Sequence, residues 1–81
     1  ELHRSLGEVY LQTGQPKKAV REFQVLLNLK PVDLATSHYR LAHALHELGD
    51  REEARRHVLF SLEIAPSFEE AQKLLLQLVR Q

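Results

Sequence analysis

The chain of 81 residues contains no cysteine, no methionine and no tryptophan. Without cysteine it can form neither a disulfide nor a thiolate zinc site, and it has no cysteine nucleophile. The absence of methionine, together with the start at Glu1, predicts that the chain is a segment of a longer protein. Its length suits one small domain rather than two.

The sequence also lacks an excess of charge of either sign. Eleven Lys and Arg residues balance eleven Asp and Glu residues, so the formal net charge is zero. A neutral chain provides no general electrostatic field for holding nucleic acid or an anionic membrane. Apolar runs reach only three residues, as in Leu74 to Leu76, whereas a bilayer span takes about 20. We therefore expect neither a nucleic-acid partner nor membrane insertion.

What the sequence does contain is an internal repeat. A shift of 35 residues aligns several identical residues: His3 with His38, Leu6 with Leu41, Gly14 with Gly49, Ala19 with Ala54, Arg21 with Arg56, Leu27 with Leu62, and Pro31 with Pro66. The same shift aligns similar residues: Gly7 with Ala42, Tyr10 with Leu45, Phe23 with Val58, and Leu29 with Ile64. Most of these positions are small or apolar, which indicates repeated packing rather than a repeated catalytic site.

Within each unit the apolar residues recur with a helical period. Helices are expected over about residues 2–13, 16–29, 33–48, 51–64 and 67–80. The predicted inward-facing residues of the first helix of each unit are Leu2, Leu6, Val9 and Tyr10, then Leu41, Ala44, Leu45 and Leu48. No segment shows a strand pattern. The fold class is therefore predicted to be all-α, with five helices.

Local signals define where these helices begin and end. Gly14 and Gly49 can adopt the left-handed conformation that ends a helix, and Pro31 disfavours helical geometry at the residue before it. Asp33 is expected to act as an N-cap. Two further start signals are the pair Asp50 with Glu53 and the capping box Ser67 with Glu70.

The ordered pattern resembles the tetratricopeptide repeat. The residues that carry the likeness are Leu6-Gly7, Tyr10, Gly14, Ala19, Phe23 and Pro31, then Leu41-Ala42, Leu45, Gly49, Ala54 and Pro66. The family's frequent Trp is replaced by His3 and His38, and His38 is expected to take part in packing. The resemblance implies a right-handed α-α superhelix with helical hairpins at 1–33 and 34–66. Residues 67–81 would form a C-terminal capping helix or the start of a third repeat.

The resemblance implies a scaffold or adaptor that binds a peptide or helix of a protein partner, without catalysis. The binding surface would be a concave groove lined by the first helix of each pair. Its expected residues are Arg4, Glu8, Leu11, Gln12, Tyr39, Arg40, His43, His46, Lys73 and Gln77. The alternative is that these residues form ordinary solvated helix faces. The carboxylate clamp of one family branch would fall on Arg4, Glu8, Arg40, Glu70 and Leu74, and this set is incomplete.

A second interpretation concerns apolar residues that lie outside the predicted inward-facing side of their helices. They are Phe60, Phe68, Leu76 and Val79. Such a surface predicts docking on another chain, a homo-oligomer formed through the last helix, or packing against the rest of a longer protein. A wide apolar arc that simply covers a broad groove is the simpler explanation.

Chemical sites are not expected in this chain. His43 and His46 share a helix face, but they lack the spacing of a zinc protease motif and a third ligand. Three isolated glycines form no phosphate-binding loop, and no serine has an obvious base. We expect no metal, no cofactor and no enzyme. If His43 and His46 lie in the groove, an acidic partner should bind more tightly at about pH 5.5 than at about pH 7.5.

Overall fold

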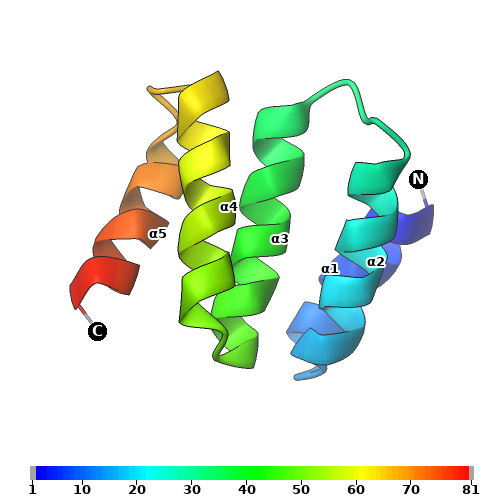
Figure 1. The fold of residues 1–81 in the computed structure, drawn as a ribbon. Helices are drawn as coiled ribbons and strands as arrows, with labels where there is room; N and C mark the ends of the chain where they lie inside the picture. The colour runs from blue at the N-terminus through cyan, green and yellow to red at the C-terminus, as the bar shows by residue number, and fades with distance from the viewer. Residues whose placement is uncertain (1, 81) are drawn as a thin grey trace.

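The computed structural model describes residues 2–80, and five helices lie within that range. Helices α1 (Leu2–Gln12) and α2 (Pro16–Asn28) form one antiparallel pair, and α3 (Leu34–Leu48) and α4 (Arg51–Ile64) form a second (Figure 1). Helix α5 (Glu69–Arg80) packs against α4 and also contacts α3. The all-α prediction with five helices is confirmed.

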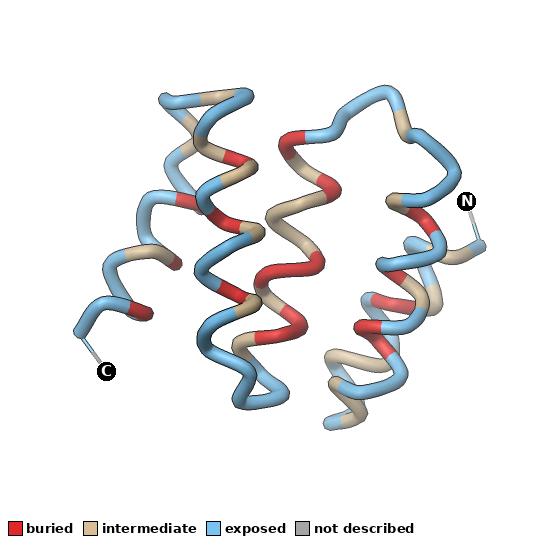
Figure 2. The backbone as a smooth tube through the Cα atoms, viewed as in Figure 1, coloured by how far each residue is buried: buried red, intermediate tan, exposed pale blue. Residues whose placement is uncertain are grey.

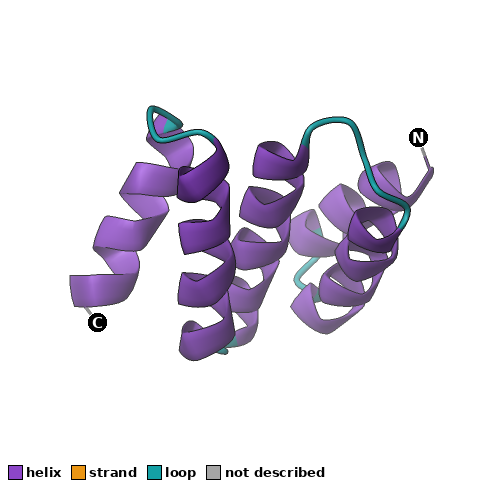
Figure 3. Ribbon diagram, turned by 45° about the horizontal axis from the view of Figure 1, so that its top comes forward, coloured by secondary structure: helices purple, strands orange, loops and turns teal. Residues whose placement is uncertain are grey.

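The helices stack in chain order. Helix α2 packs on both α1 and α3, so the two pairs join into one layered body in which α1 and α5 lie at opposite ends (Figure 1). The connections lie at the ends of the helices and leave the flanks of the stack open (Figure 3). The body measures 29 × 27 × 17 Å. None of the helices within residues 2–80 combines the length and apolar character that a membrane crossing requires.

The helix ends follow the predicted local signals. Gly14 and Gly49 have φ angles of +73° and +97°, the left-handed conformation that glycine adopts without strain. Asp33 caps α3, because its carboxylate accepts hydrogen bonds from the Thr36 N–H at 3.0 Å and the Thr36 hydroxyl at 2.6 Å. These two bonds lower the pKa of the Asp33 carboxyl. The Asp50 carboxylate likewise accepts from the Glu53 N–H, at 3.3 Å.

The predicted N-cap of α5, Ser67, is wrong by one residue, since the helix begins at Glu69. Pro66 and Ser67 lie in a turn, which the Phe68 N–H closes onto the Ala65 carbonyl at 3.1 Å. The Phe68 carbonyl then accepts from the Gln72 N–H, so Phe68 occupies the capping position. The capping box of Ser67 and Glu70 does not form because Ser67 precedes that position by one residue.

The core lies between the layers of helices (Figure 2). It consists mainly of leucine and alanine, with one phenylalanine: Ala19, Val20, Phe23, Leu26, Leu41, Ala42, Ala44, Leu45, Ala54, Val58, Ala71, Leu74 and Leu78. Ala19 and Ala54 are completely buried. Small residues at these two equivalent positions let the helix backbones approach closely, in agreement with the repeated packing predicted from the aligned positions.

Three residues expected in the core are exposed instead. Leu2 and Val9 lie on α1, which contacts only α2 extensively and buries only Gly7. A helix at the end of a stack has neighbours on one side, so part of its apolar stripe stays open. Leu48 is exposed in the last turn of α3, where it lies beside the turn between α1 and α2.

Candidate functional site

A hollow on the inner flank of the stack lies between α1, α3 and the start of α5. We call it the inner groove, and its volume is about 490 Å³. Its lining combines apolar and charged side chains from four helices and the turn before α5: Glu8, Leu11, Phe23, Thr36, Tyr39, Arg40, His43, Phe68 and Glu70.

Helix α3 supplies the centre of the groove. Tyr39, Arg40 and His43 occupy one face because residues three and four apart lie above one another on a helix. Leu41, Ala42 and Leu45 lie on the opposite side and are buried in the core. The amphipathic pattern of α3 therefore both anchors the helix and presents the groove residues.

Half of the predicted binding residues meet in this groove. Glu8, Leu11, Tyr39, Arg40 and His43 line it. Arg4 lines an adjoining hollow of about 470 Å³ under the connection between α2 and α3, and Arg40 lines both hollows. Four residues of the predicted set do not line either hollow: Gln12, His46, Lys73 and Gln77.

Two aromatic rings form part of the groove wall. The ring centroids of Tyr39 and Phe68 are 5.2 Å apart and tilted by 53°, and the His43 ring stacks on Tyr39 at 6.2 Å. Burial raises the pKa of the Tyr39 hydroxyl, and the nearby Glu70 carboxylate raises it further. The Tyr39 hydroxyl is therefore neutral, and it lies in the negative field of Glu70.

The charged groups of the groove are partly paired. The Arg40 Nε lies 3.6 Å from the Glu8 Oε2, an ion pair that joins α3 to α1. The His43 Nε2 lies 3.8 Å from the Glu47 Oε2 on the same helix. Among the described residues, Glu70 forms no ion pair.

Four lining residues are absent from the predicted groove set, although Glu70 was aligned with the carboxylate clamp and Phe68 was assigned to the docking surface. Thr36 could have been found, since it precedes Arg40 by one helical turn. Phe23 reaches the groove from α2 because Gly7 leaves room for its ring: a Cβ on Gly7 would lie 2.5 Å from a ring carbon. Phe68 and Glu70 arrive through the turn before α5, and helical spacing alone does not predict that turn.

The four residues predicted as one docking surface are separated in the structure. Phe68 lines the inner groove, and Phe60 packs between α3 and α4 with its ring centroid 5.2 Å from that of His38. Only Leu76 and Val79 are largely exposed on α5, at 52% and 60%. The predicted surface is thus reduced to these two residues, because Phe60 and Phe68 have partners within the fold.

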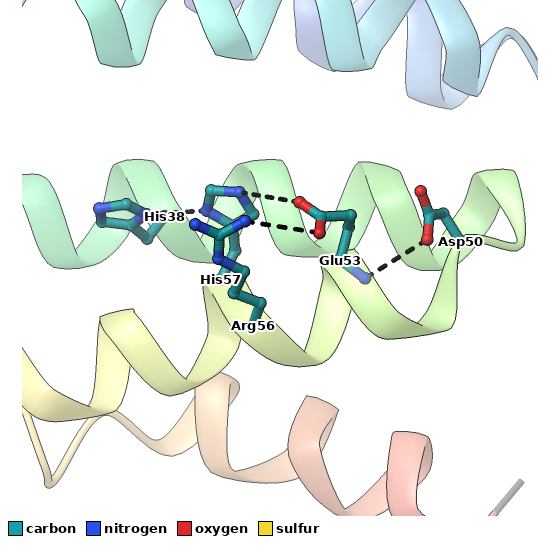
Figure 4. Close-up of polar contacts among 5 residues, drawn as sticks. All are labelled: His38, Asp50, Glu53, Arg56 and His57. Carbon is teal, nitrogen blue, oxygen red and sulfur yellow. Dashed lines mark hydrogen bonds and ion pairs between the residues drawn. The ribbon is translucent and has the colours of Figure 1, made fainter.

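A histidine pair joins α3 to α4 (Figure 4). The Nδ1 atoms of His38 and His57 lie 3.0 Å apart, and the two rings stack with centroids 5.2 Å apart. Burial lowers the pKa of both rings. For His57 the neighbouring His38 lowers the pKa further, and Glu53, 4.0 Å from its Nε2, opposes the shift. His38 thus packs against α4, in agreement with its expected packing role.

No metal centre is formed by the part of the chain that the structure describes. Within residues 2–80, no three His, Asp, Glu or Cys side chains come close enough together to hold an ion. The groove histidine, His43, faces a single carboxylate, and the pair of His38 and His57 has no third ligand.

The comparisons with known proteins agree with this geometry. A family model described as Tetratricopeptide repeat matches residues 1–24 and 35–59, more than half of the chain. Each match covers the first helix of a pair and extends into the second. No curated protein matches the chain. Repeats of this kind are non-catalytic units that generally mediate protein–protein interaction. The chain belongs to the tetratricopeptide repeat family.

Proposed function

We propose that this chain binds an extended peptide or a helix of a partner protein in the inner groove, as a scaffold unit without catalysis. In this proposal residues 1–33 and 34–66 act as two repeats, and residues 67–81 cap them or open a third. The observation that carries it is the open hollow of about 490 Å³ with half-buried rings beside charged side chains. Mixed surfaces of this type are favourable for protein partners, since rings supply area and rim charges supply specificity.

The side chains of the groove support binding rather than chemistry. The Thr36 hydroxyl donates to Asp33 as part of a helix cap. The raised pKa of Tyr39 keeps its hydroxyl protonated near neutral pH, so the phenolate that could act as a base is not populated. The groove also contains two carboxylates, Glu8 and Glu70, which disfavour a nucleic-acid backbone.

Selection of peptides tests this proposal. Random peptides displayed on phage can be selected on the immobilised chain and their affinity measured by fluorescence anisotropy. Replacing Tyr39→Ala should weaken the selected peptides by about tenfold or more, because the ring is central to the groove. Replacing Leu59→Ala, an exposed leucine of α4 outside the groove, should leave affinity unchanged.

Two results would contradict groove binding. Unchanged affinity of the Tyr39→Ala variant, with its fold verified by circular dichroism, would exclude a central role of the groove. Because Tyr39 also packs against the core, Glu8→Ala offers an exposed groove change with little risk to the fold. Unchanged peptide affinity in both variants would show that the peptides bind outside the inner groove.

A second candidate function is self-association through α5. The observation that favours it is the exposure of Leu76 and Val79 on the last helix of the stack. Sedimentation at several concentrations should then detect a dimer, and Leu76→Glu or Val79→Glu should abolish it. A monomer at every concentration would exclude this function.

A further inference from the structure

We infer that the inner groove selects peptides presenting a basic side chain, arginine or lysine, beside an apolar one. This inference rests on the proposed function and specifies the chemistry of the partner. It follows from the way in which charges and rings are combined around Tyr39, Phe68 and Glu70.

The first step is the charge balance of the groove. Arg40 is matched by the Glu8 carboxylate at 3.6 Å, and His43 is matched by Glu47 at 3.8 Å. Glu70 lines the groove and forms no ion pair among the described residues. Lys73, one turn further along α5, does not line the groove. The unmatched charge that the groove offers to a partner is therefore negative.

The second step is the position of the rings. The ring centroids of Tyr39 and Phe68 lie 5.2 Å apart, and the Glu70 carboxylate lies close enough to raise the pKa of the Tyr39 hydroxyl. A cation above an aromatic face is attracted by the electron density of the ring. A guanidinium satisfies both features, because its plane can stack on a ring while its N–H groups donate to a carboxylate.

The third step concerns the rest of the occupant. Leu11 is partly buried and offers an apolar surface next to the rings, above the almost completely buried Phe23. In an extended peptide, successive side chains point to opposite faces, and side chains two residues apart share one face about 7 Å from each other. An apolar residue at the second position from the basic one can therefore cover this surface. The occupant is thus a short basic and apolar segment.

An acidic segment fits the same groove poorly. Its carboxylate would have to displace Glu8 from Arg40 or Glu47 from His43, and it would face Glu70. Like charges at short range are repulsive, and such repulsion is a common source of specificity. The acidic partner suggested by His43 and His46 remains a prediction from sequence. The charge balance favours the opposite sign.

Two peptides that differ at one position test the inference. They are the acetylated and amidated sequences Gly-Leu-Gly-Arg-Gly and Gly-Leu-Gly-Glu-Gly, in which the leucine and the charged residue share one face of the extended chain. Each is titrated into the isotopically labelled chain while amide chemical shifts are recorded. The arginine peptide should bind at least about fivefold more tightly and shift the amides of Tyr39, Arg40 and Glu70. Its advantage should fall as salt rises from about 50 mM to about 500 mM, because screening weakens exposed charges.

A pair of adjacent glutamates provides the matched control. Glu69 and Glu70 are both exposed in the first turn of α5, and only Glu70 lines the groove. Replacing Glu70→Gln should weaken the arginine peptide by about threefold, as expected for an exposed ion pair. Replacing Glu69→Gln should leave its affinity unchanged.

The outcomes distinguish this inference from the proposed function. Equal or tighter binding of the glutamate peptide at the same amides would overturn the basic preference and leave groove binding intact. Equal effects of Glu70→Gln and Glu69→Gln would also overturn it. If neither peptide shifts the groove amides at millimolar concentration, the inference fails. The proposed function fails only when phage-selected peptides avoid the groove as well.

Discussion

The two helical pairs share a backbone plan but differ in the side chains that join their helices. Ala19 and Ala54 lie 35 residues apart in sequence, and both are completely buried. In the first pair, His3 of α1 meets Glu22 of α2, with 2.8 Å between Nδ1 and Oε1. In the second pair, the equivalent positions are His38 and His57. The comparison teaches that the repeat preserves close packing while its polar contacts have diverged.

The same contrast appears in the size of the packed residues. Gly7 and Phe23 of the first pair correspond to Ala42 and Val58 of the second. A Cβ on Gly7 would collide with the Phe23 ring, whereas Ala42 and Val58 are both buried without such a ring. A large residue is thus accompanied by a small one in the first pair, and two medium residues fill the same place in the second.

The largest expected effect occurs where the two pairs agree. Replacing Ala54→Leu, or Ala19→Leu, should destabilise the fold by up to about 3 kcal/mol, because the added carbons overpack a fully buried helix crossing. Thermal unfolding measures the loss, and Val25→Leu on the exposed side of α2 serves as the control. An unchanged thermal unfolding midpoint for Ala54→Leu would show that Ala54 does not lie at a tightly packed helix crossing.

The next effect tests the exchange of sizes. Replacing Gly7→Ala should cost about 1 to 2 kcal/mol, since the clash with Phe23 exceeds the gain in helix propensity. Adding Phe23→Val recreates the combination of the second pair. The double variant should be less destabilised than the sum of the single variants, measured by chemical denaturation. Strict additivity would mean that Gly7 and Phe23 do not compensate each other.

A smaller effect concerns a hydrogen bond present in one pair. The buried Ser61 hydroxyl donates to the Ala35 carbonyl at 2.8 Å and joins α4 to α3. The equivalent position in the first pair is Leu26. Replacing Ser61→Ala should cost about 1 kcal/mol, as expected for one buried hydrogen bond. The exposed Ser5→Ala change is the control, and equal unfolding free energies for both variants would contradict this assignment.

The smallest effect at neutral pH, and one that grows in acid, concerns the histidine pair. The lowered pKa values of His38 and His57 mean that the folded chain binds protons less tightly than the unfolded chain. The contribution of this pair to folding stability is therefore fully present above the ordinary histidine pKa of about 6.5, and it declines as the pH falls below that value. The thermal unfolding midpoint should therefore fall when the pH is lowered from about 7.5 to about 5.

Geometry explains this sign. The two Nδ1 atoms share one hydrogen bond, and protonation of both rings would place an N–H on each Nδ1, break this bond and bring two cations together. The neighbouring groups are Glu53 and Arg56 on α4, which form an ion pair with each other, and the neutral Gln24 and Asn28 on α2.

Replacing His57→Glu tests this prediction, because it copies the contact of the first pair. The acid-induced decline in midpoint should be reduced in this variant and retained in His43→Gln, which changes a histidine on another face. Thermal unfolding across pH measures both. A decline that is equal in all three proteins would assign the acid sensitivity to other groups.

Local signals in the sequence were sufficient for most of the fold. Gly14, Gly49 and Asp33 act within one turn of their own position, so their roles could be read from the chain. The start of α5 could not, because two residue types suitable for capping, Ser67 and Glu70, were present in the wrong register. Exposure of Leu2 and Leu48 depends on which neighbours a helix has, and a single helix does not encode this.

The groove was half predictable for a similar reason. The periodicity of one helix predicts that Tyr39, Arg40 and His43 share a face. The repeat predicts that the first helix of the other pair, with Glu8 and Leu11, lines the same groove. Phe68 and Glu70 depend on a turn that folds α5 back toward α3, a tertiary feature. The partner of His38 was equally hidden, since His57 lies 19 residues away and no motif links the two.

The central claim is that this chain binds a protein segment in the inner groove. Titration of a phage-selected peptide into the isotopically labelled chain, with amide chemical shifts mapped residue by residue, tests it most directly. The structure predicts that the largest shifts occur at Glu8, Tyr39, Arg40 and Glu70. Shifts confined to the exposed part of α5 around Leu76 and Val79, or to the contact between α3 and α4 around His57, would contradict it.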